Sequence, residues 1–394
     1  MDEVIRRIYL DRLLSGKDRP DTVKIITGMR RSGKTVLMGQ YISLLKESGI
    51  PESRIIHLNF ESKTLAHIRD HMDLLEEIDK RYTGERTYVF LDEIQTVKSW
   101  ERAINSLQTD YDADIYITGS NAYLLSGDLS TYISGRYTEL PMLPLSFSEF
   151  LELHPGDRNE RFYQYICSGS LPVIDPDADE MFEHDHLIGL FNTVMMKDVL
   201  RNCKGGDVGT LTDITRFLYS NIGKITSANN IAVTLKKDPE KVRSYLDALG
   251  KAFLIYKAER YDIRGKKLLN TLEKYYVSDT GMRNAVLGIS SREDISRQIE
   301  NIVYLELLRR GYEVAVGKYG DREVDFTARR GSEIQYFQVT MSMLSEDTYE
   351  REISPFRMIR DNYPKTVLSM DTFVTDLPDG LIHINLLDWL LVRV

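Results

Sequence analysis

The sequence predicts an α/β protein whose N-terminal part is built on a mostly parallel sheet. Apolar strand patterns alternate with helix patterns from about residue 23 to residue 145, which is typical of a sheet covered by helices. Two strands run into polar motifs, at residues 28–35 and at Asp92-Glu93. Helical, hairpin and further α/β patterns follow, so we expect four domains, over residues 1–152, 153–206, 207–285 and 286–394.

The strand Val23–Thr27 leads into a glycine-rich loop and then into a helix pattern at residues 36–42. The loop reads G-x-x-x-x-G-K-T and is formed by Gly28, Met29, Arg30, Arg31, Ser32, Gly33, Lys34 and Thr35. In such a phosphate-binding loop, backbone N–H groups surround the phosphate oxygens. Lys34 reaches the β- and γ-phosphates, and the Thr35 hydroxyl ligates Mg²⁺. Only one of Arg30 and Arg31 can point toward the phosphates.

The strand Thr87–Leu91 is continuously apolar, as in strands that are buried on both faces of a parallel sheet. It ends in Asp92-Glu93. We expect Asp92 to hold Mg²⁺ through water and Glu93 to polarise the water that attacks the γ-phosphate. An acidic strand end is weak evidence alone, but downstream of a phosphate-binding loop it predicts hydrolysis.

Two further features are candidates for the same site. The strand Ile115–Thr118 ends in Gly119-Ser120-Asn121, and Ser120 or Asn121 is expected to reach the γ-phosphate or the attacking water. The alternative is a simple turn, since these residue types favour turns. Arg136 is a candidate for a guanidinium that stabilises the transition state, and a surface salt bridge is its alternative.

Together these motifs resemble the AAA+-superfamily ATPases of bacteria and archaea that carry a C-terminal domain of unknown function. The resemblance rests on residues 27–35, 90–95, 117–122, 134–137 and 143–150, and continues at residues 168–172, 196–199 and 274–281. It implies an AAA+ core at 1–152 with a helical lid at 153–206, and ATP as the nucleotide. It also implies that Ser120 or Asn121 is a sensor and that Arg136 is a sensing or finger arginine, in cis or in trans. Oligomers occur among AAA+ relatives, but the resemblance supplies no cellular role.

Charge, hydropathy and cysteine content limit the partners and the cellular compartment that we expect for this protein. The net charge of −9 argues against indiscriminate coating of nucleic acid, and no apolar run is long enough to span a membrane. The N-terminus lacks the pattern of a secretory signal. The two cysteines, Cys167 and Cys203, imply no disulfide framework and fit a reducing compartment, so we expect a cytoplasmic protein.

The segment 207–285 predicts a winged helix. Three short helices, at about 213–219, 228–235 and 239–249, precede a hairpin with a turn near residues 264–267. Residues 208–275 contain thirteen Lys or Arg and seven Asp or Glu, so this segment is basic within an acidic chain. The expected DNA contacts are Lys241, Arg243, Ser244, Arg264, Lys266 and Lys267. A module that docks a protein or another domain is the alternative.

The segment 286–394 resembles restriction-endonuclease-like PD-(D/E)xK domains in its order of a helix followed by three strands. Asp325 matches the strand aspartate and Glu300 the helix glutamate, but Gln338-Val339-Thr340 stands where Glu-x-Lys is expected. Glu323 shares a strand face with Asp325 and is a conceivable substitute carboxylate. We therefore expect a catalytically degraded domain that serves as a scaffold.

The function that follows is hydrolysis of ATP with Mg²⁺, coupled to a winged-helix module that binds DNA. One alternative is an ATP-gated regulator that binds DNA or protein and hydrolyses little ATP. The other is a metal-dependent nuclease.

Overall fold

The computed structural model describes residues 4–125, 135–203, 206–289 and 294–392. It divides into two units. The first contains residues 1–144 and 251–253, and the second contains residues 145–250 and 254–394. The division into four domains stays a prediction. None of the described helices is long and apolar enough to cross a membrane.

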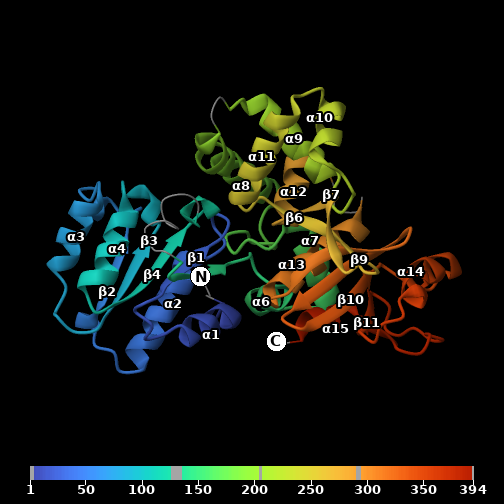
Figure 1. Ribbon diagram of the computed structural model, residues 1–394, viewed down its shortest axis with the longest axis horizontal. Helices are drawn as coiled ribbons and strands as arrows, with labels where there is room; N and C mark the ends of the chain where they lie inside the picture. The colour runs from blue at the N-terminus through green and yellow to red at the C-terminus, as the bar shows by residue number, and fades with distance from the viewer. Residues whose placement is uncertain (1–3, 126–134, 204–205, 290–293, 393–394) are drawn as a thin grey trace. The chain divides into compact units, whose positions relative to one another are not determined.

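The first unit is built on a five-stranded sheet in the order β2-β3-β4-β1-β5, and every pairing in it is parallel (Figure 1). The strands are β1 (Val23–Thr27), β2 (Ile55–Asn59), β3 (Thr87–Asp92), β4 (Ala113–Gly119) and β5 (Tyr137–Pro141). Strands β1, β3 and β4 are buried along their whole length, because helices cover both faces of the sheet. The predicted α/β class and parallel sheet are thereby confirmed.

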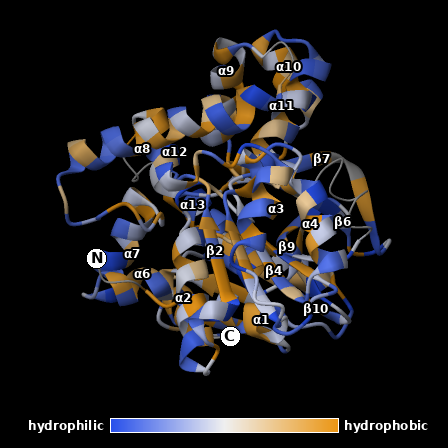
Figure 2. Cartoon of the chain, turned by 90° about the vertical axis from the view of Figure 1, so that its left-hand side faces the viewer, coloured by the Kyte–Doolittle hydropathy of each residue, from blue (hydrophilic) through white to orange (hydrophobic). Residues whose placement is uncertain are grey.

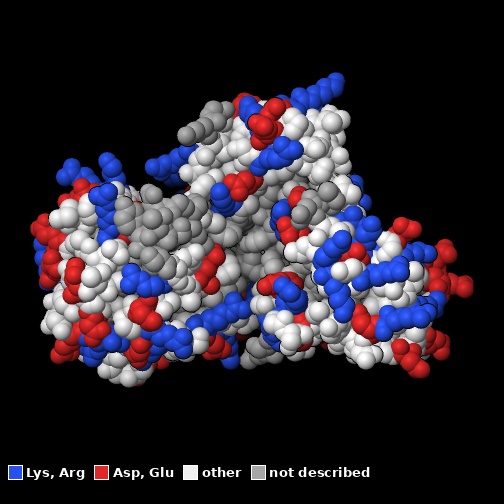
Figure 3. Space-filling model, in the orientation of Figure 1, with Lys and Arg blue, Asp and Glu red and all other residues white. Residues whose placement is uncertain are grey.

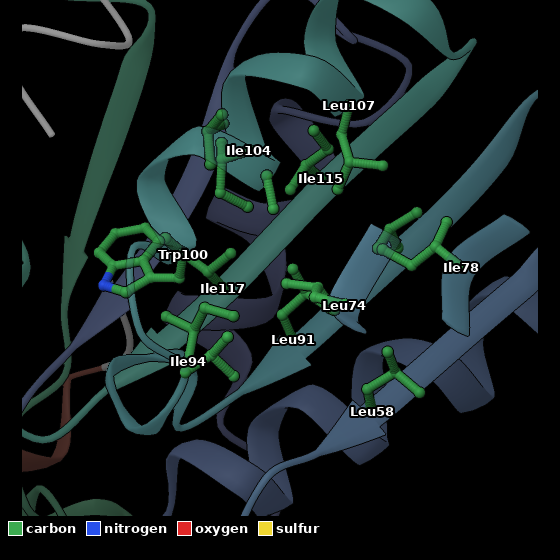
Figure 4. Packing of buried hydrophobic residues seen from close by; sticks show 14 of the residues in the cluster. Leu58, Leu74, Ile78, Leu91, Ile94, Trp100, Ile104, Leu107, Ile115 and Ile117 are labelled. Atoms are coloured by element: carbon green, nitrogen blue, oxygen red, sulfur yellow. The ribbon is translucent and has the colours of Figure 1, made fainter. Parts of the chain in front are cut away.

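Four helices cover this sheet: α1 (Arg7–Ser15), α2 (Lys34–Glu47), α3 (His71–Asp79) and α4 (Trp100–Asp110). Leu74, Ile104 and Leu107 of α3 and α4 pack on the face that carries Leu91 and Ile117 (Figure 4). Helices α1 and α2 pack on the opposite face, against a separate cluster. Figure 2 shows strands of this sheet largely in orange, as expected where two apolar layers enclose them.

The second unit begins with helices and a hairpin: α6 (Phe147–Leu153), α7 (Arg158–Ser168), α8 (Glu180–Val194), α9 (Val208–Ser220), α10 (Ala228–Leu235), α11 (Pro239–Lys251), β6 (Ile255–Asp262), β7 (Lys267–Val277) and α12 (Thr280–Leu287). The three predicted helices and the hairpin are present. The first helix begins earlier than expected because Asp207 caps it, accepting hydrogen bonds from the N–H groups of Gly209 and Thr210. Cys167 and Cys203 are both free thiols.

The C-terminal elements continue the same unit: α13 (Ile295–Arg309), β8 (Glu313–Tyr319), β9 (Arg322–Arg330), β10 (Glu333–Val339), α14 (Glu346–Met358), β11 (Lys365–Ser369), β12 (Leu381–Asn385) and α15 (Leu386–Leu391). Their strands join the hairpin in a seven-stranded sheet of order β12-β11-β10-β9-β8-β6-β7. Strand β6 pairs with β8 in parallel, with Arg260 opposite Val316. The hairpin predicted as the wing of a winged helix is therefore part of the C-terminal sheet.

Two sequence motifs of the second unit meet in its interior. A Cβ atom at Gly169 would lie 2.3 Å from a carboxylate oxygen of Asp279, and one at Gly281 would lie 2.1 Å from the backbone oxygen of Ser168. Both positions exclude any side chain, which explains why glycines stand in the loop after α7 and at the start of α12.

Candidate nucleotide site

The glycine-rich loop joins β1 to α2, and its backbone takes conformations that favour glycine at two places. Gly28 has φ of +149° and Gly33 has φ of +99°. A Cβ atom at Gly28 would lie 2.3 Å from the backbone oxygen of Met142, on the segment that follows β5. The loop therefore depends on these glycines to turn tightly at the end of the strand.

The ammonium group of Lys34 lies inside this loop. Its Nζ atom donates hydrogen bonds to the backbone oxygens of Gly28 (3.0 Å) and Met29 (3.1 Å). It also lies 3.9 Å from a carboxylate oxygen of Glu93. The side chain is buried, so a positive charge is held at the centre of the loop.

The loop fits a phosphate group with a bound Mg²⁺. The Ser32 hydroxyl is buried and has no hydrogen-bond partner among the described residues. Thr35 lies in the first turn of α2 with its side chain exposed, where its hydroxyl is available to a cation. Helix N-termini favour anions because their first N–H groups are unpaired within the helix. Residues 28–35 thus offer an ammonium, a hydroxyl and backbone donors to one anion.

Asp92 ends β3 beside this loop and is fully buried. One carboxylate oxygen accepts a hydrogen bond from the Thr118 hydroxyl, and that hydroxyl oxygen accepts one from the backbone N–H of Glu93 (2.9 Å). The other carboxylate oxygen is buried and has no partner among the described residues. An oxygen held in this way fits the predicted role of Asp92 in holding water on Mg²⁺.

Glu93 is held in an unusual backbone conformation, with φ of +56°. Such a conformation costs a non-glycine residue on the order of 1–3 kcal/mol and persists where the surrounding structure enforces it. Burial raises the pKa of the Glu93 carboxyl, while the nearby Lys34 ammonium opposes the rise. The Gln95 side chain donates a hydrogen bond to the carboxylate. Glu93 is thus a buried, oriented carboxylate next to the loop lysine.

Ser120 and Asn121, at the end of β4, differ in their surroundings. The Ser120 hydroxyl oxygen lies 3.4 Å from the side-chain nitrogen of Gln95 and 3.5 Å from the guanidinium of Arg30. The Asn121 side chain instead accepts a hydrogen bond from the N–H of Tyr123 (3.1 Å), which stabilises the following turn. Ser120 therefore lies beside Gln95 and Arg30. Arg31 has φ of +69° and an exposed side chain.

Arg136 lies at the end of the sheet where its parallel strands begin, opposite the end that carries the phosphate-binding loop. It immediately precedes β5, and its backbone oxygen accepts a hydrogen bond from the N–H of Val23, where β1 begins. The phosphate-binding loop follows Thr27, where β1 ends, so about 16 Å separates the two ends at roughly 3.3 Å per strand residue. The structure does not bring Arg136 to the nucleotide site of its own chain, and an action in trans stays a prediction. The neighbouring Ser134 lies outside the described residues.

Comparisons with known proteins show the family to which this chain belongs. Residues 20–151 match a family model described as an AAA domain, and residues 159–293 match a domain of unknown function, DUF8612. An uncharacterized protein of Haemophilus influenzae is 38% identical over 400 residues, which cover 98% of each chain. This chain belongs to the same family of AAA-domain proteins. A second uncharacterized protein of the family, from Methanocaldococcus jannaschii, is 30% identical over 87% of this chain and 80% of its own.

The AAA domain places the family in the AAA+ superfamily, as the sequence motifs implied. Among solved structures, Cdc6p from Pyrobaculum aerophilum is similar over 76% of this chain and 94% of its own. Its sequence identity is 14% and its TM-score 0.31, values too low to transfer any function.

Sequence reasoning missed two groups at the AAA site. Thr118 ties Asp92 to Glu93, and Gln95 orients the Glu93 side chain. A threonine near the end of an otherwise apolar strand was the available signal for Thr118. Gln95 lies within the matched motif at residues 90–95, but only the packed strands show what it touches.

The second unit brings together the carboxylates predicted from the nuclease resemblance, with a cation that was not predicted. Lys274, on β7, has its ammonium 2.9 Å from Glu300 on α13 and 2.8 Å from Glu323 on β9. Tyr276 donates a hydrogen bond to the same Glu300 oxygen (2.7 Å). Lys274 is only 3% exposed, and this burial lowers the pKa of its ammonium, but the neighbouring carboxylates together outweigh burial and raise the pKa.

The other residues singled out by the nuclease resemblance are held by local hydrogen bonds. Gln338 accepts from the N–H of Asp325 (2.6 Å) and donates to Glu352 (2.8 Å). Burial and the neighbouring Glu300 carboxylate raise the pKa of Asp325 well above its ordinary value. The Thr340 hydroxyl donates to the backbone oxygen of Ser342 at 3.4 Å, and it carries no charge. A neutral amide and a hydroxyl thus stand where a carboxylate and an ammonium were needed.

The predicted DNA-contacting residues divide into two sets. Arg243 and Ser244 are exposed on α11, and Arg243 donates to the side chain of Asn229 (2.8 Å), while Lys241 is half-buried near the ring of Tyr245. The second set lies exposed around the hairpin turn: Arg264, Lys266 and Lys267. On the face drawn in Figure 3, basic side chains over β9 and α14 are interleaved with acidic ones. That part of the surface carries mixed charge.

Proposed function

We propose that this AAA-domain protein hydrolyses ATP with Mg²⁺. The observation that carries the proposal is the meeting of Lys34, Asp92 and Glu93 at the carboxyl edge of one sheet, with the Lys34 ammonium 3.9 Å from the Glu93 carboxylate. The Lys34 ammonium is suited to bind phosphate, the Asp92 carboxylate to bind a hydrated cation, and the Glu93 carboxylate to orient a water molecule.

In this proposal Lys34 and the loop N–H groups bind the β- and γ-phosphates. Thr35 and Asp92 hold Mg²⁺, which neutralises charge on the phosphate oxygens when bound. The Glu93 carboxylate orients the attacking water and accepts its proton, for which it must be ionised. Ser120, beside Gln95 and Arg30, is the sensor residue that supports the position of the γ-phosphate. Arg136 acts on the nucleotide from a neighbouring copy of the chain.

The test is Mg²⁺-dependent ATP turnover of the purified chain and of two variants. Lys34→Ala removes the phosphate-binding ammonium and Glu93→Gln removes the water-orienting charge, so each should lower turnover by at least about 100-fold, the usual scale for such groups. Lys46→Ala and Glu76→Gln are matched controls, because both side chains are exposed on helices of the same unit. Equal turnover in all five proteins would overturn the proposal.

A second proposed function is nucleotide-gated DNA binding by the helices and hairpin of residues 207–285. The excess of basic residues in this segment and the exposed Arg264, Lys266 and Lys267 support it. Binding to a DNA duplex should weaken steeply with salt, because phosphate contacts release counterions.

That proposal is tested by fluorescence anisotropy of a labelled duplex across a salt series, with and without ATP. The variant Lys266→Gln, Lys267→Gln should weaken binding and reduce the salt dependence. Arg357→Gln, an exposed arginine of α14, is the control for removal of a surface charge. Binding that persists in Glu93→Gln with ATP would favour gating without hydrolysis. No binding at about 50 mM salt would exclude DNA as the partner. Docking of a protein would then remain as the hypothesis for this segment.

A further inference from the structure

Arg6 has an unusual place for an arginine, because the residue is only 2% exposed. One guanidinium nitrogen, Nη1, donates a hydrogen bond to the backbone oxygen of Ser32 in the phosphate-binding loop (3.0 Å). The other, Nη2, donates to the backbone oxygens of Leu143 (2.8 Å) and Pro144 (3.2 Å). A single charged group thus bridges two segments that are more than 100 residues apart.

The neighbours of Arg6 hold it in this position. Gln40, on α2, accepts from the Arg6 N–H (3.3 Å) and donates to the backbone oxygen of Val4 (2.8 Å). The guanidinium lies 5.0 Å from the centre of the Tyr9 ring, and the Tyr9 hydroxyl accepts a hydrogen bond from the Leu143 N–H (3.0 Å). The segment before α1 is therefore fixed to α2 and to the exit of β5.

The bridged segment lies where the chain leaves the first unit. Pro144 is the last residue of the first unit before the chain enters the second, and Met142 donates to the backbone oxygen of Thr27, just before the loop (2.7 Å). A shift of the phosphate-binding loop would therefore act directly on residues 142–144, which continue into the second unit. The planar guanidinium suits this task because it donates in two fixed directions and stays charged, whereas a lysine ammonium cannot reproduce this fork.

We propose that Arg6 is a positioning residue that transmits the nucleotide state of the phosphate-binding loop to residues 143–145. This inference rests on the proposed nucleotide function and names a route for its regulation. A purely structural arginine would donate to the same carbonyl oxygens, but residues 143–145 would then not change when nucleotide binds. The two roles therefore differ in the response to nucleotide and not in stability alone.

The experiment is hydrogen–deuterium exchange of the full chain with and without a non-hydrolysable ATP analogue and Mg²⁺. Two amides report on the segment: Leu143, bonded to Tyr9, and Leu145, bonded to the Ser170 backbone oxygen (2.8 Å). In the unaltered chain the analogue should change their exchange rates by about fivefold or more, the lower range of coupling between sites. In Arg6→Gln and Arg6→Lys the change should fall below about twofold.

Arg7→Gln is the control, because Arg7 is the next residue along the chain and is exposed. It should respond to the analogue as the unaltered chain does. A full response in Arg6→Gln overturns the proposal, and so does the absence of any response in the unaltered chain, even if both Arg6 variants fail to fold. Turnover measured in parallel separates the two claims. ATP hydrolysis without a response at these amides removes only the role of Arg6, whereas no binding and no hydrolysis removes the proposed function itself.

Discussion

The Asp279 carboxylate is buried in the second unit and accepts two hydrogen bonds from Ser170, one from the backbone N–H (2.6 Å) and one from the hydroxyl (3.1 Å). Its other oxygen accepts from the N–H of Met282 (2.7 Å) and so caps α12. One side chain therefore joins the loop after α7 to the start of α12, across 109 residues of sequence.

Replacing Asp279 by Ala should destabilise the second unit strongly, because it removes a buried helix cap and leaves the Ser170 N–H without its acceptor. We expect a loss of about 2–4 kcal/mol in the free energy of unfolding, from a cap and an unsatisfied buried donor together. Asp157→Ala is the matched control, since Asp157 caps α7 at an exposed position. Equal losses in urea titrations of the two variants would show that the buried contact to Ser170 adds nothing.

Gly28→Ala should abolish ATP turnover, because the added methyl group would meet the Met142 backbone oxygen at 2.3 Å and φ of +149° is strained for alanine. Gly39→Ala, in the second turn of α2, meets no atom within 4 Å and should keep turnover while stabilising the helix by roughly 0.5–1 kcal/mol. Turnover and thermal unfolding of both variants check the pair. Normal turnover in Gly28→Ala would contradict the proposed geometry of the loop.

ATP turnover should fall on acidification, with its midpoint above 4.5, the ordinary pKa of a glutamate carboxyl. Burial raises the pKa of Glu93, and the proposed role needs the ionised form, so activity is present above the raised pKa and lost as pH falls through it. A pH–rate profile between pH 4.5 and 8 measures the midpoint. The residual rate of Glu93→Gln should lack this acid limb, and an identical limb in that variant would assign it to another group.

Lys274→Met should cost about 3–5 kcal/mol of stability, because it leaves Glu300 and Glu323 facing each other without their buried cation. Lys257→Met on the neighbouring strand is the control. Lys257 is 47% exposed, and its ion pairs with Glu259 and Glu273 should be worth no more than about 1 kcal/mol. The folded-state pKa of Lys274 is raised, so its contribution should be full at neutral pH and lost only as pH rises through that pKa. Denaturant titrations of both variants at pH 7 give the comparison.

Residues 286–394 should not cleave DNA with Mg²⁺ or Mn²⁺. Burial raises the pKa of Asp325, Glu300 is already paired with the Lys274 ammonium, and Gln338 supplies no charge, so a cation finds weak ligands there. Cleavage of linear and supercoiled DNA is measured on gels, with Asp325→Ala alongside. Metal-dependent cleavage that is lost in Asp325→Ala would reverse this expectation.

The sequence predicted the first unit well because its signals are local. The apolar runs at Val23–Thr27 and Thr87–Leu91 and the motif at residues 28–35 each lie within a few residues of the element they define. Contacts between distant segments left no such signal. Lys274 reaches Glu300 only because β7 and α13 pack together, and Arg6 meets Ser32 only in the folded first unit.

The place of Arg136 in the sheet also could not be predicted from the sequence. Its motif indicated an arginine that acts on nucleotide, but only the register of β5, with Tyr137 opposite Val23, shows at which edge it lies. Ser120 and Asn121 could not be told apart in the sequence either, because both follow β4 and only the structure shows that Ser120 meets the Gln95 side chain and Asn121 the N–H of Tyr123.

The pairing of β6 with β8 has a consequence for dividing this protein into pieces. The matched DUF8612 region ends at residue 293, yet β8 begins at Glu313, so this boundary cuts through a continuous sheet. A truncated chain that stops there would expose the backbone edge of β6, and unpaired strand edges promote aggregation. Residues 159–293 are therefore unsuited to expression alone, and a soluble C-terminal fragment needs the strands from β6 through β12 together.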